Sequence, residues 1–325
     1  MTLRQPTLDR RRLLLVGLLW LVVSLLLLIT FRPERDFALW WTIFDAAHLP
    51  VFGSMGWATI WAFRERRWPQ TIAAVAFVAV LAAGTEGAQL FTGRDATLSD
   101  LLWNLAGGTI GVALGRAAFG ARAGAPASPI AAALLGALAL GLFAFASAPA
   151  VREVAALDHF RRAFPAIGDF ETPIELVWWR RNGGARIART DEGSATGRFA
   201  LRVELGRGRY PGVAVEGRSF DWAGYDTLAF WVDNPGESFP LLVRVDDDGD
   251  CDEYEDRYNG RFVVPRGASR VAIPLARVET APRARRMRLS RIRGLYVFAE
   301  AATTPAYFLI DDVRVGRAAQ SASGR

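Results

Sequence analysis

Residues 84–115 read GTEGAQLFTGRDATLSDLLWNLAGGTIGVALG, an apolar segment that acquires polar and charged side chains and then becomes apolar again. The polar positions include Glu86, Gln89, Arg94, Asp100 and Asn104. A carboxylate at the end of a hydrophobic helix costs free energy, so it requires a partner or a function. The stretch therefore predicts two membrane helices, joined by a turn that forms part of a polar site.

Apolar runs fill the part of the chain that precedes residue 151. Hydrophobic residues make up 51% of the 325 residues, and the long uncharged runs, such as 13–31 and 123–151, all lie there. The second half contains arginine and acidic residues throughout, as a soluble domain does. The first half predicts an all-α transmembrane helical bundle with spans at about residues 13–31, 46–63, 69–90, 98–119 and 129–147.

The arginines predict how these spans are oriented. Three arginines at 10–12 precede the first span, which is longer than the roughly 7 to 15 residues of a signal-peptide core, so we expect a retained helix. Short cytoplasmic loops carry an excess of arginine and lysine. The N-terminus and the loops after the second and fourth spans are the richer side. We therefore expect residues 1–12 in the cytoplasm and the chain after residue 151 outside it, at the plasma (inner) membrane.

Polar residues of three predicted helices fall at one level on the outer side. The second span contributes Asp45 and His48, the third Glu86 and Gln89, the following loop Arg94, and the fourth span Asp100 and Asn104. Within each helix the two residues are three or four positions apart, so they share one face. The pattern predicts a polar pocket that opens outward.

These residues also have other interpretations. Thr97 and Asp100 fit a helix capping box, and Asn104 can bind between helices. A metal site built from the acids and the histidine is disfavoured, because no close ligand spacing such as H-E-x-x-H occurs. A membrane-embedded enzyme acting on a phospholipid or polyprenyl-linked headgroup stays open, with Glu86 or Asp100 as general base and Arg94 binding phosphate.

The same residues resemble a known family. The segments Asp45-Ala-Ala-His48, Glu86-x-x-Gln89, Arg94 and Asp100-x-x-x-Asn104-x-x-Gly107 are similar to those of VanZ-like membrane proteins over about residues 10–120. One departure is Ala46, where these proteins usually have lysine. The resemblance implies a four-helix domain at 13–120, followed by a fifth helix at 121–150. It also implies a role in the cell envelope, since the family is named after glycopeptide antibiotic resistance clusters.

From residue 169 onward, short strands alternate with turn residues. Leu201, Val203 and Leu205 alternate with Arg202 and Glu204, which is the period of a half-buried strand. We predict strands at 175–179, 199–205, 213–215, 227–232, 241–245, 262–264, 270–273, 295–299 and 307–315. This predicts an all-β jelly-roll sandwich over 169–316, after a linker at 151–168 and before a disordered tail at 317–325. A short juxtamembrane helix, whose arginines contact lipid headgroups, is the alternative to the linker.

Five motifs of this half resemble jelly-roll carbohydrate-binding modules of the galactose-binding-like kind, over about residues 165–316. They are FE at 170–171, DRYN at 256–259, PRG at 265–267, VAIP at 271–274 and FLIDDV at 308–313. The resemblance implies glycan binding and a structural calcium shared by Glu171 and Asp311. The acidic run 246–252 departs from a calcium-binding EF-hand loop, so we expect a solvated acidic loop there.

Sugar sites use aromatic platforms, and the candidates in this half are Trp178, Trp179, Tyr210, Tyr254 and Tyr258. Neighbouring residues of a strand point to opposite faces, so one of the two tryptophans is expected to point inward.

The combined prediction is a non-catalytic binding or accessory factor of the cell envelope. We expect it to contact membrane lipid and to recognise a glycan or a lipid-linked precursor through the pocket and the jelly roll. A membrane anchor for a sandwich that binds another protein is a further alternative. All 39 basic residues are arginine and lie among acids, so the net charge of +6 does not predict a nucleic-acid partner. The single cysteine, Cys251, permits no internal disulfide.

Overall fold

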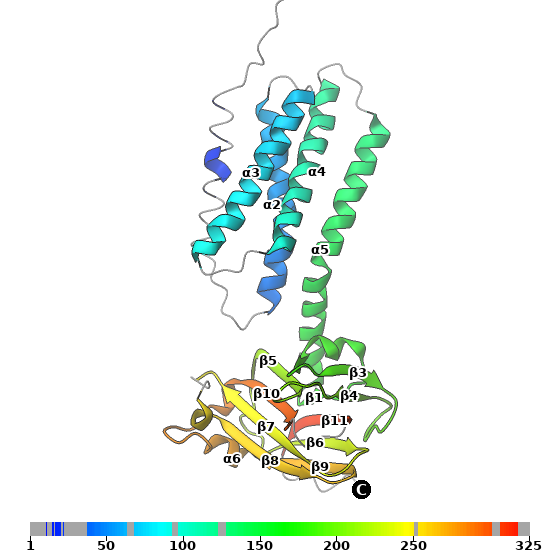
Figure 1. Cartoon of the computed structure of the whole chain (residues 1–325), viewed down its shortest axis with the longest axis vertical. Coiled ribbons are helices and arrows are strands. Elements are labelled where there is room, and N and C mark those ends of the chain that lie inside the picture. Colours follow the sequence, from blue (N-terminus) through cyan, green and yellow to red (C-terminus); the bar gives the residue numbers. More distant parts are fainter. Residues whose placement is uncertain are drawn as a thin grey trace, which may run out of the picture. The chain divides into compact units, whose positions relative to one another are not determined.

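The computed structural model divides the chain into two compact units, whose boundary lies between residues 151 and 152 (Figure 1). It describes residues 38–63, 68–92, 97–122, 128–249, 253–300 and 306–317, together with isolated positions between 11 and 22. The predicted first span, the cytoplasmic tail and the disordered tail lie almost entirely outside these residues.

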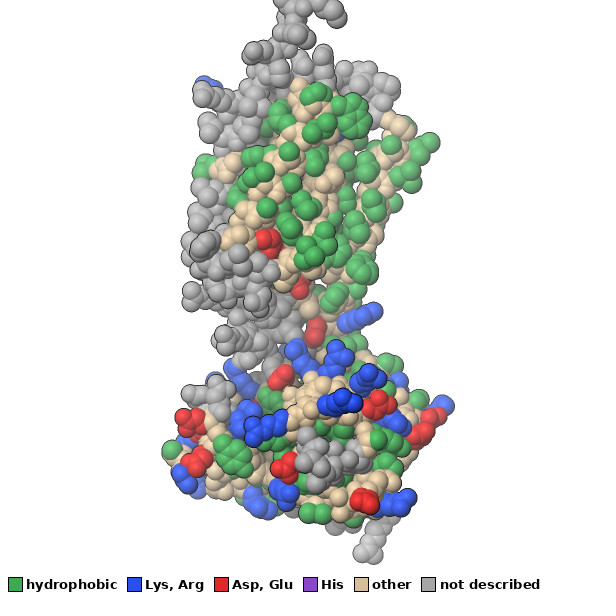
Figure 2. All heavy atoms as spheres, in the orientation of Figure 1, with side chains coloured by type: hydrophobic (Ala, Val, Ile, Leu, Met, Phe, Trp, Pro, Cys, Tyr) green, Lys and Arg blue, Asp and Glu red, His purple; other side chains and the backbone are tan. Residues whose placement is uncertain are grey.

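The first unit is built from long helices that run side by side (Figure 1). They are α2 (Ala38–Ala62), α3 (Trp68–Thr92), α4 (Leu98–Arg122) and the first part of α5 (Pro129–Ala163). Segments of α3 and α5 are long and apolar enough to cross a membrane. Figure 2 shows mainly hydrophobic side chains on the surface of these helices, and many charged ones on the second unit.

Glycines let α2 and α4 approach until their backbones touch. A methyl group on Gly111 would overlap the carbonyl oxygen of Gly53, and one on Gly107 would overlap that of Leu49. Small residues at such positions are typical of helix contacts in membranes, where van der Waals packing replaces the hydrophobic effect between helices. Phe52, Ile60, Ala74, Val78, Ala82 and Val112 form the core of this unit.

The segment predicted as a linker is largely helical. α5 continues to Ala163, and its residues 152–163 belong to the second unit, where their apolar side chains pack against the sandwich. Ala156 belongs to the sandwich core, and the Phe160 ring lies 4.1 Å from the Trp178 ring, centroid to centroid. The linker prediction for these residues is therefore wrong.

The second unit is an antiparallel β-sandwich of two sheets, which confirms the predicted fold class. One sheet has the order β3-β4-β11-β6-β9 with β1 also paired to β11, and the other has the order β2-β5-β10-β7-β8. The strands are β1 (Ala166–Gly168), β2 (Trp179–Asn182), β3 (Arg186–Thr190), β4 (Ala200–Glu204), β5 (Gly212–Phe220), β6 (Thr227–Asn234), β7 (Phe239–Asp247), β8 (Tyr258–Val264), β9 (Gly267–Pro274), β10 (Ile292–Ala299) and β11 (Tyr307–Gly316).

The inward residues of both sheets form one hydrophobic core. In β7, Phe239, Leu241, Val243 and Val245 are buried and alternate with partly exposed residues, which is the pattern that predicted this strand. Two differences are found. Residues 173–177 form a 3₁₀ helix in place of the start of the predicted strand 175–179, and β1 and β3 were not predicted. Pro173 at the first helical position favours the 3₁₀ turn.

Candidate functional site

The structure joins three of the predicted pocket residues in a chain of hydrogen bonds. Asn104 of α4 donates from Nδ2 to Oε1 of Glu86 of α3 at 3.0 Å, and its Oδ1 lies 2.8 Å from Nδ1 of His48 of α2. Asn104 is fully buried, and Glu86 is 8% exposed. The amide therefore links one carboxylate and one imidazole across three helices. The second oxygen of Glu86 is buried without a hydrogen-bond partner among the described residues.

Three other residues of the predicted pocket are Asp45, Gln89 and Arg94. Asp45 lies one turn before His48 on α2 and is exposed. Gln89 is part of α3, but its side chain lies outside the described atoms, and Arg94 lies outside the described residues. Three of the seven predicted pocket residues are thus joined by hydrogen bonds, and the complete pocket stays a prediction.

One half of the predicted capping box at Thr97 and Asp100 is observed, and a capping role of the Asp100 carboxylate stays a prediction. The backbone N–H of Asp100 donates to the Thr97 hydroxyl at 3.0 Å, so Thr97 caps the start of α4. The Asp100 side chain is half-buried. The enzyme hypothesis, which needs Glu86 and Asp100 in one water-filled site, stays a prediction.

Three of the predicted sugar-binding aromatics belong to the core of the sandwich. Trp178, Trp179 and Tyr258 are 5%, 1% and 5% exposed. Trp178 ends the 3₁₀ helix rather than lying in a strand, so the two tryptophans need not point to opposite faces. These three side chains therefore do not form an exposed platform. Tyr254 is 69% exposed, and Tyr210, at 37%, packs near Phe298 with ring centroids 5.4 Å apart.

A different polar and aromatic surface covers the outward face of the five-stranded sheet. Tyr296 of β10 pairs with Ala214 of β5 on one side and with Arg244 of β7 on the other. A side chain on Gly294 would overlap the Tyr296 ring, so this glycine allows the ring to lie along the strand. Glu216 and Asp246 lie opposite Gly294 on the two neighbouring strands. We name Glu216, Arg244, Asp246 and Tyr296 the tyrosine cluster.

The members of the tyrosine cluster hold one another in place. The Tyr296 hydroxyl donates to Glu216 Oε2 at 2.9 Å, and Arg244 donates two hydrogen bonds to Asp246 at 2.8 and 2.6 Å. The Arg244 guanidinium carbon lies 4.8 Å from the centre of the Tyr296 ring. Burial raises the pKa of Asp246, although the hydrogen bonds and charge of Arg244 lower it in part. Burial and the nearby negative charge of Glu216 both raise the pKa of Tyr296. Tyr296 therefore remains a neutral hydroxyl at physiological pH.

The two predicted calcium ligands fasten one loop. Glu171 Oε1 accepts hydrogen bonds from the backbone N–H groups of Arg198 and Phe199 at 2.8 and 2.9 Å. Asp311 Oδ2 accepts from those of Ala195 and Thr196 at 2.8 and 2.9 Å. N–H donors thus occupy these oxygens, and the described residues contain no group of three acidic, histidine or cysteine ligands. Calcium binding stays a prediction, while the observed contacts explain the two acids as loop anchors.

The described part of the acidic run is buried in ion pairs, so the expectation of a solvated loop is wrong there. Asp247 is 3% exposed and accepts two hydrogen bonds from Arg285, at 2.6 and 2.7 Å. Arg285 also binds Asp256. Burial alone would raise the pKa of Asp247, but hydrogen bonds from Arg285 and from the N–H groups of Arg288 and Gly249 lower it to about 2. This network ties the loop before β10 to the end of β7.

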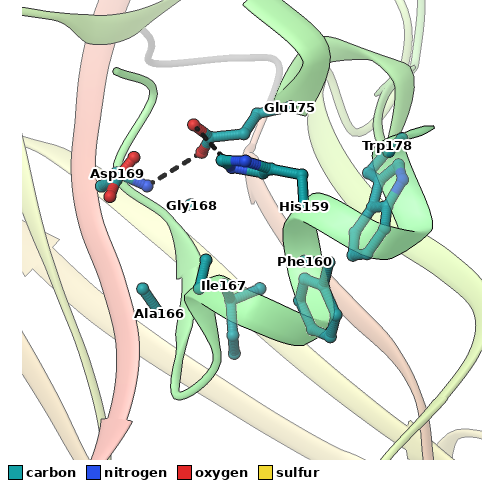
Figure 3. Close-up of a pocket in the computed structure, with 10 residues that line it drawn as sticks. His159, Phe160, Ala166, Ile167, Gly168, Asp169, Glu175 and Trp178 are labelled. Carbon is teal, nitrogen blue, oxygen red and sulfur yellow. Dashed lines mark hydrogen bonds and ion pairs between the residues drawn. The ribbon is translucent and has the colours of Figure 1, made fainter. Parts of the chain in front are cut away.

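Figure 3 shows a small cavity between the end of α5 and the turn that follows β1. The buried Glu175 accepts from the N–H groups of Asp169 and Phe170 at 3.0 and 2.9 Å, and from Thr172. His159 Nε2 lies 3.6 Å from Glu175 Oε1. Burial raises the pKa of Glu175, partly offset by the Phe170 N–H. A volume of about 10 Å³ holds no more than one water, so this site organises the turn and has no room for a substrate.

Among the described residues, two helices are long and apolar enough to cross a membrane, and an antiparallel sandwich follows them, which indicates a membrane protein that has a folded β domain. Residues 12–119 match the VanZ/LLP1 family, which confirms the first resemblance. No curated protein matches the chain.

Solved structures similar to the sandwich include carbohydrate-binding modules. The family 11 module from Clostridium thermocellum, in complex with a β-1,3-1,4-mixed-linked tetrasaccharide, is 13% identical over 46% of this chain and 94% of that chain, with a TM-score of 0.37. The CBM22-1 xylan-binding domain from Paenibacillus barcinonensis is 13% identical over 47% and 92%, with a TM-score of 0.32. An exo-β-agarase is 16% identical over 47% of this chain and 24% of that chain, with a TM-score of 0.38.

Sequence reasoning did not identify the tyrosine cluster. Its members come from β5, β7 and β10, and β10 lies between the other two in the sheet although it follows both in the chain. The only local signal is the alternation within each strand, which shows that Arg244 and Tyr296 face outward. The order of the strands, and thus the contact between these residues, needs the tertiary fold.

Proposed function

We propose that this protein is a membrane-anchored binding factor, and that its sandwich recognises a glycan of the cell envelope through the tyrosine cluster. The observation that carries the proposal is the Tyr296 ring, which lies over Gly294 on an outward sheet face beside charged groups. Carbohydrates present both apolar ring faces and hydroxyl groups. A tyrosine has an apolar ring, which can pack against the apolar face of a sugar, and a hydroxyl group, which can form hydrogen bonds with sugar hydroxyls.

The charged pairs supply the polar part of such a site. Glu216 accepts from the Tyr296 hydroxyl through Oε2, and its carboxylate can also accept hydrogen bonds from ligand hydroxyl groups, while the buried Asp246 holds the Arg244 guanidinium in place. These groups are already held by one another, so little side-chain entropy is lost when a ligand binds. A preorganised aromatic surface with a few fixed polar groups is the usual composition of a small-molecule site.

The location of the glycan follows from the proposed topology. The arginine distribution predicts that the residues after 151 lie outside the cytoplasm, and the match to the VanZ/LLP1 family supports the proposal of an envelope role. In this proposal the helical unit holds the sandwich at the membrane surface. A reporter fused after residue 317 that is active only in the cytoplasm would contradict this topology.

The binding test uses the full chain, purified in detergent, with cell-wall glycan and membrane polysaccharide fractions immobilised as probes. We expect retention of the wild type and at least about tenfold weaker retention of Tyr296→Ala, because truncation of a central aromatic contact costs roughly 1–2 kcal/mol or more. Tyr254→Ala is the matched control, since Tyr254 is exposed and lies outside the cluster.

Three results would contradict the proposal. Equal retention of the wild type and Tyr296→Ala would remove the tyrosine cluster from the site. A loss confined to Tyr254→Ala would instead support the platform that the sequence predicted. Absence of glycan retention, together with capture of a protein, would favour the anchor alternative.

A further inference from the structure

The helical unit contains a large cavity that the proposed glycan function does not use. It has a volume of about 580 Å³, within the roughly 300–1,000 Å³ of ligand pockets, and is bounded by α2, α4 and α5. The lining residues are Leu49, Pro50, Gly53, Ser54, Trp57, Gly107, Ile110, Gly111, Leu114, Ala139, Leu140 and Phe143. Apart from the Ser54 hydroxyl and the Trp57 ring nitrogen, their side chains are hydrocarbon. Such a cavity favours an apolar occupant over water.

Close contact between α2 and α4 fixes one wall of this cavity. Gly53, Gly107 and Gly111 line it, and the backbones of the two helices already touch at these residues. The two helices therefore cannot move closer to fill the space. The opposite wall is Leu140 and Phe143 of α5.

The cavity opens to the surroundings of the helices. Leu140, Phe143 and Trp57 line it and are also 69%, 43% and 40% exposed. Leu134, Leu138 and Phe145 of α5 are exposed as well, at 65%, 52% and 71%. An apolar helix of this length is stable with such exposure only in a hydrocarbon medium. The medium that reaches the cavity is therefore the interior of the bilayer.

The length of the cavity matches one leaflet. Leu49 and Trp57 mark its extent along α2, which is about 12 Å at the helical rise of 1.5 Å per residue. Half of a hydrocarbon core of roughly 30 Å is about 15 Å. One end of the cavity is polar. Leu49 and Gly107 line that end, His48 directly precedes Leu49 on α2, and Asn104 lies one turn before Gly107 on the same face of α4. No hydrogen bond joins the second ring nitrogen of His48 to any residue that the structure describes.

We propose that α2, α4 and α5 bind one acyl chain of a membrane phospholipid in this cavity, with the headgroup end beside His48. Three observations support this proposal: the apolar lining of the cavity, its lateral opening and the match of its length to one leaflet. The occupant is a phospholipid because this lipid forms the leaflet to which the cavity opens. The proposal is independent of glycan binding by the sandwich.

The test uses the full chain in vesicles that contain a phospholipid with a photoreactive acyl chain. We expect crosslinks to peptides of α2, α4 or α5 that line the cavity. Ala139→Trp fills the cavity from α5, where no close helix contact is disturbed, and is expected to lower crosslinking about tenfold, the effect of roughly 1.4 kcal/mol. Ala137→Trp is the matched control, because Ala137 is exposed on α5 outside the lining. Its crosslinking is expected to equal that of the wild type.

The outcomes separate the alternatives. Crosslinks spread evenly over all helices, or equal losses in the two tryptophan variants, would overturn the proposal. A photoreactive polyprenyl phosphate that displaces the phospholipid at equal concentration would overturn the choice of occupant. Thermal unfolding of each variant in detergent is measured in parallel, and Ala139→Leu, a smaller filling change, replaces Ala139→Trp if the latter does not fold.

Discussion

The buried acids of the two units are stabilised in different ways. Asp247 in the sandwich is paired with the Arg285 guanidinium and with two backbone N–H groups. Glu86 in the helical unit accepts a hydrogen bond from the neutral amide of Asn104, and its second oxygen is buried without a hydrogen-bond partner among the described residues. An acid with a full set of partners stabilises the fold. An acid that is only partly paired between apolar helices is expected to have a function.

The largest expected effect is on the sandwich. Asp247→Asn removes the buried charge that Arg285 pairs with, and breaking such a pair costs about 3–5 kcal/mol in the free energy of unfolding. Urea unfolding of the full chain in detergent, followed by tryptophan fluorescence, measures it. Asp158→Asn breaks only the exposed pair with Arg162, so its expected cost is below about 1 kcal/mol. Similar costs for the two variants would show that the buried network is not structural.

Acid should weaken the same network. The pKa of Asp247 is about 2 in the folded protein against 3.8 for the free side chain, so the carboxylate is favoured by folding. Its contribution, about 2 kcal/mol, is complete above pH 3.8 and is lost as the pH falls through about 2. Unfolding free energies measured across this range should fall more for the wild type than for Asp247→Asn. Parallel curves would contradict this assignment.

A smaller loss is expected at the turn before the 3₁₀ helix. Glu175→Gln replaces one carboxylate oxygen by an NH₂ group, which cannot accept a hydrogen bond. The variant therefore loses either the bonds from the N–H groups of Asp169 and Phe170 or the bond from Thr172, depending on which oxygen is replaced. An unsatisfied buried donor costs about 1–3 kcal/mol, so thermal unfolding should occur at a lower temperature. The control is Glu237→Gln at an exposed site, which should leave the transition unchanged.

The smallest effect on stability is expected at Glu86. Glu86→Gln keeps an oxygen for Asn104 and removes a charge that is only partly paired, so the cost should be below about 1 kcal/mol. Thermal unfolding of the helical unit in detergent measures this cost. Asn104→Leu removes the hydrogen bonds of Asn104 to both His48 and Glu86. It should therefore destabilise the protein more than Glu86→Gln does. If Glu86→Gln lowers the free energy of unfolding as much as Asp247→Asn does, the buried acids of the two units do not differ in their contribution to stability.

Local sequence patterns predicted where helices and strands lie better than they predicted which residues these elements contact. Alternation predicted most strands of the sandwich, and apolar runs predicted the described helices, because both depend on which side chains are buried. For residues 151–168 a linker was preferred to the alternative of a short helix, because the burial of this segment is supplied by the distant residues Trp178 and Phe220. Trp178, Trp179 and Tyr258 were assigned to a surface for the same reason, since composition does not reveal which aromatic groups face the core.

The two-part organisation, the apolar helices, the β class of the second half and the polar residues Glu86 and Asn104 could all be predicted from the amino-acid sequence. These follow from hydrophobic content and its period, which are properties of the local chain. Only the tertiary structure decided that Asn104 joins Glu86 to His48, that Arg285 pairs with Asp247, and that Tyr296 lies beside Arg244. The physical reason is that these contacts depend on strand order and helix packing between residues far apart in the chain.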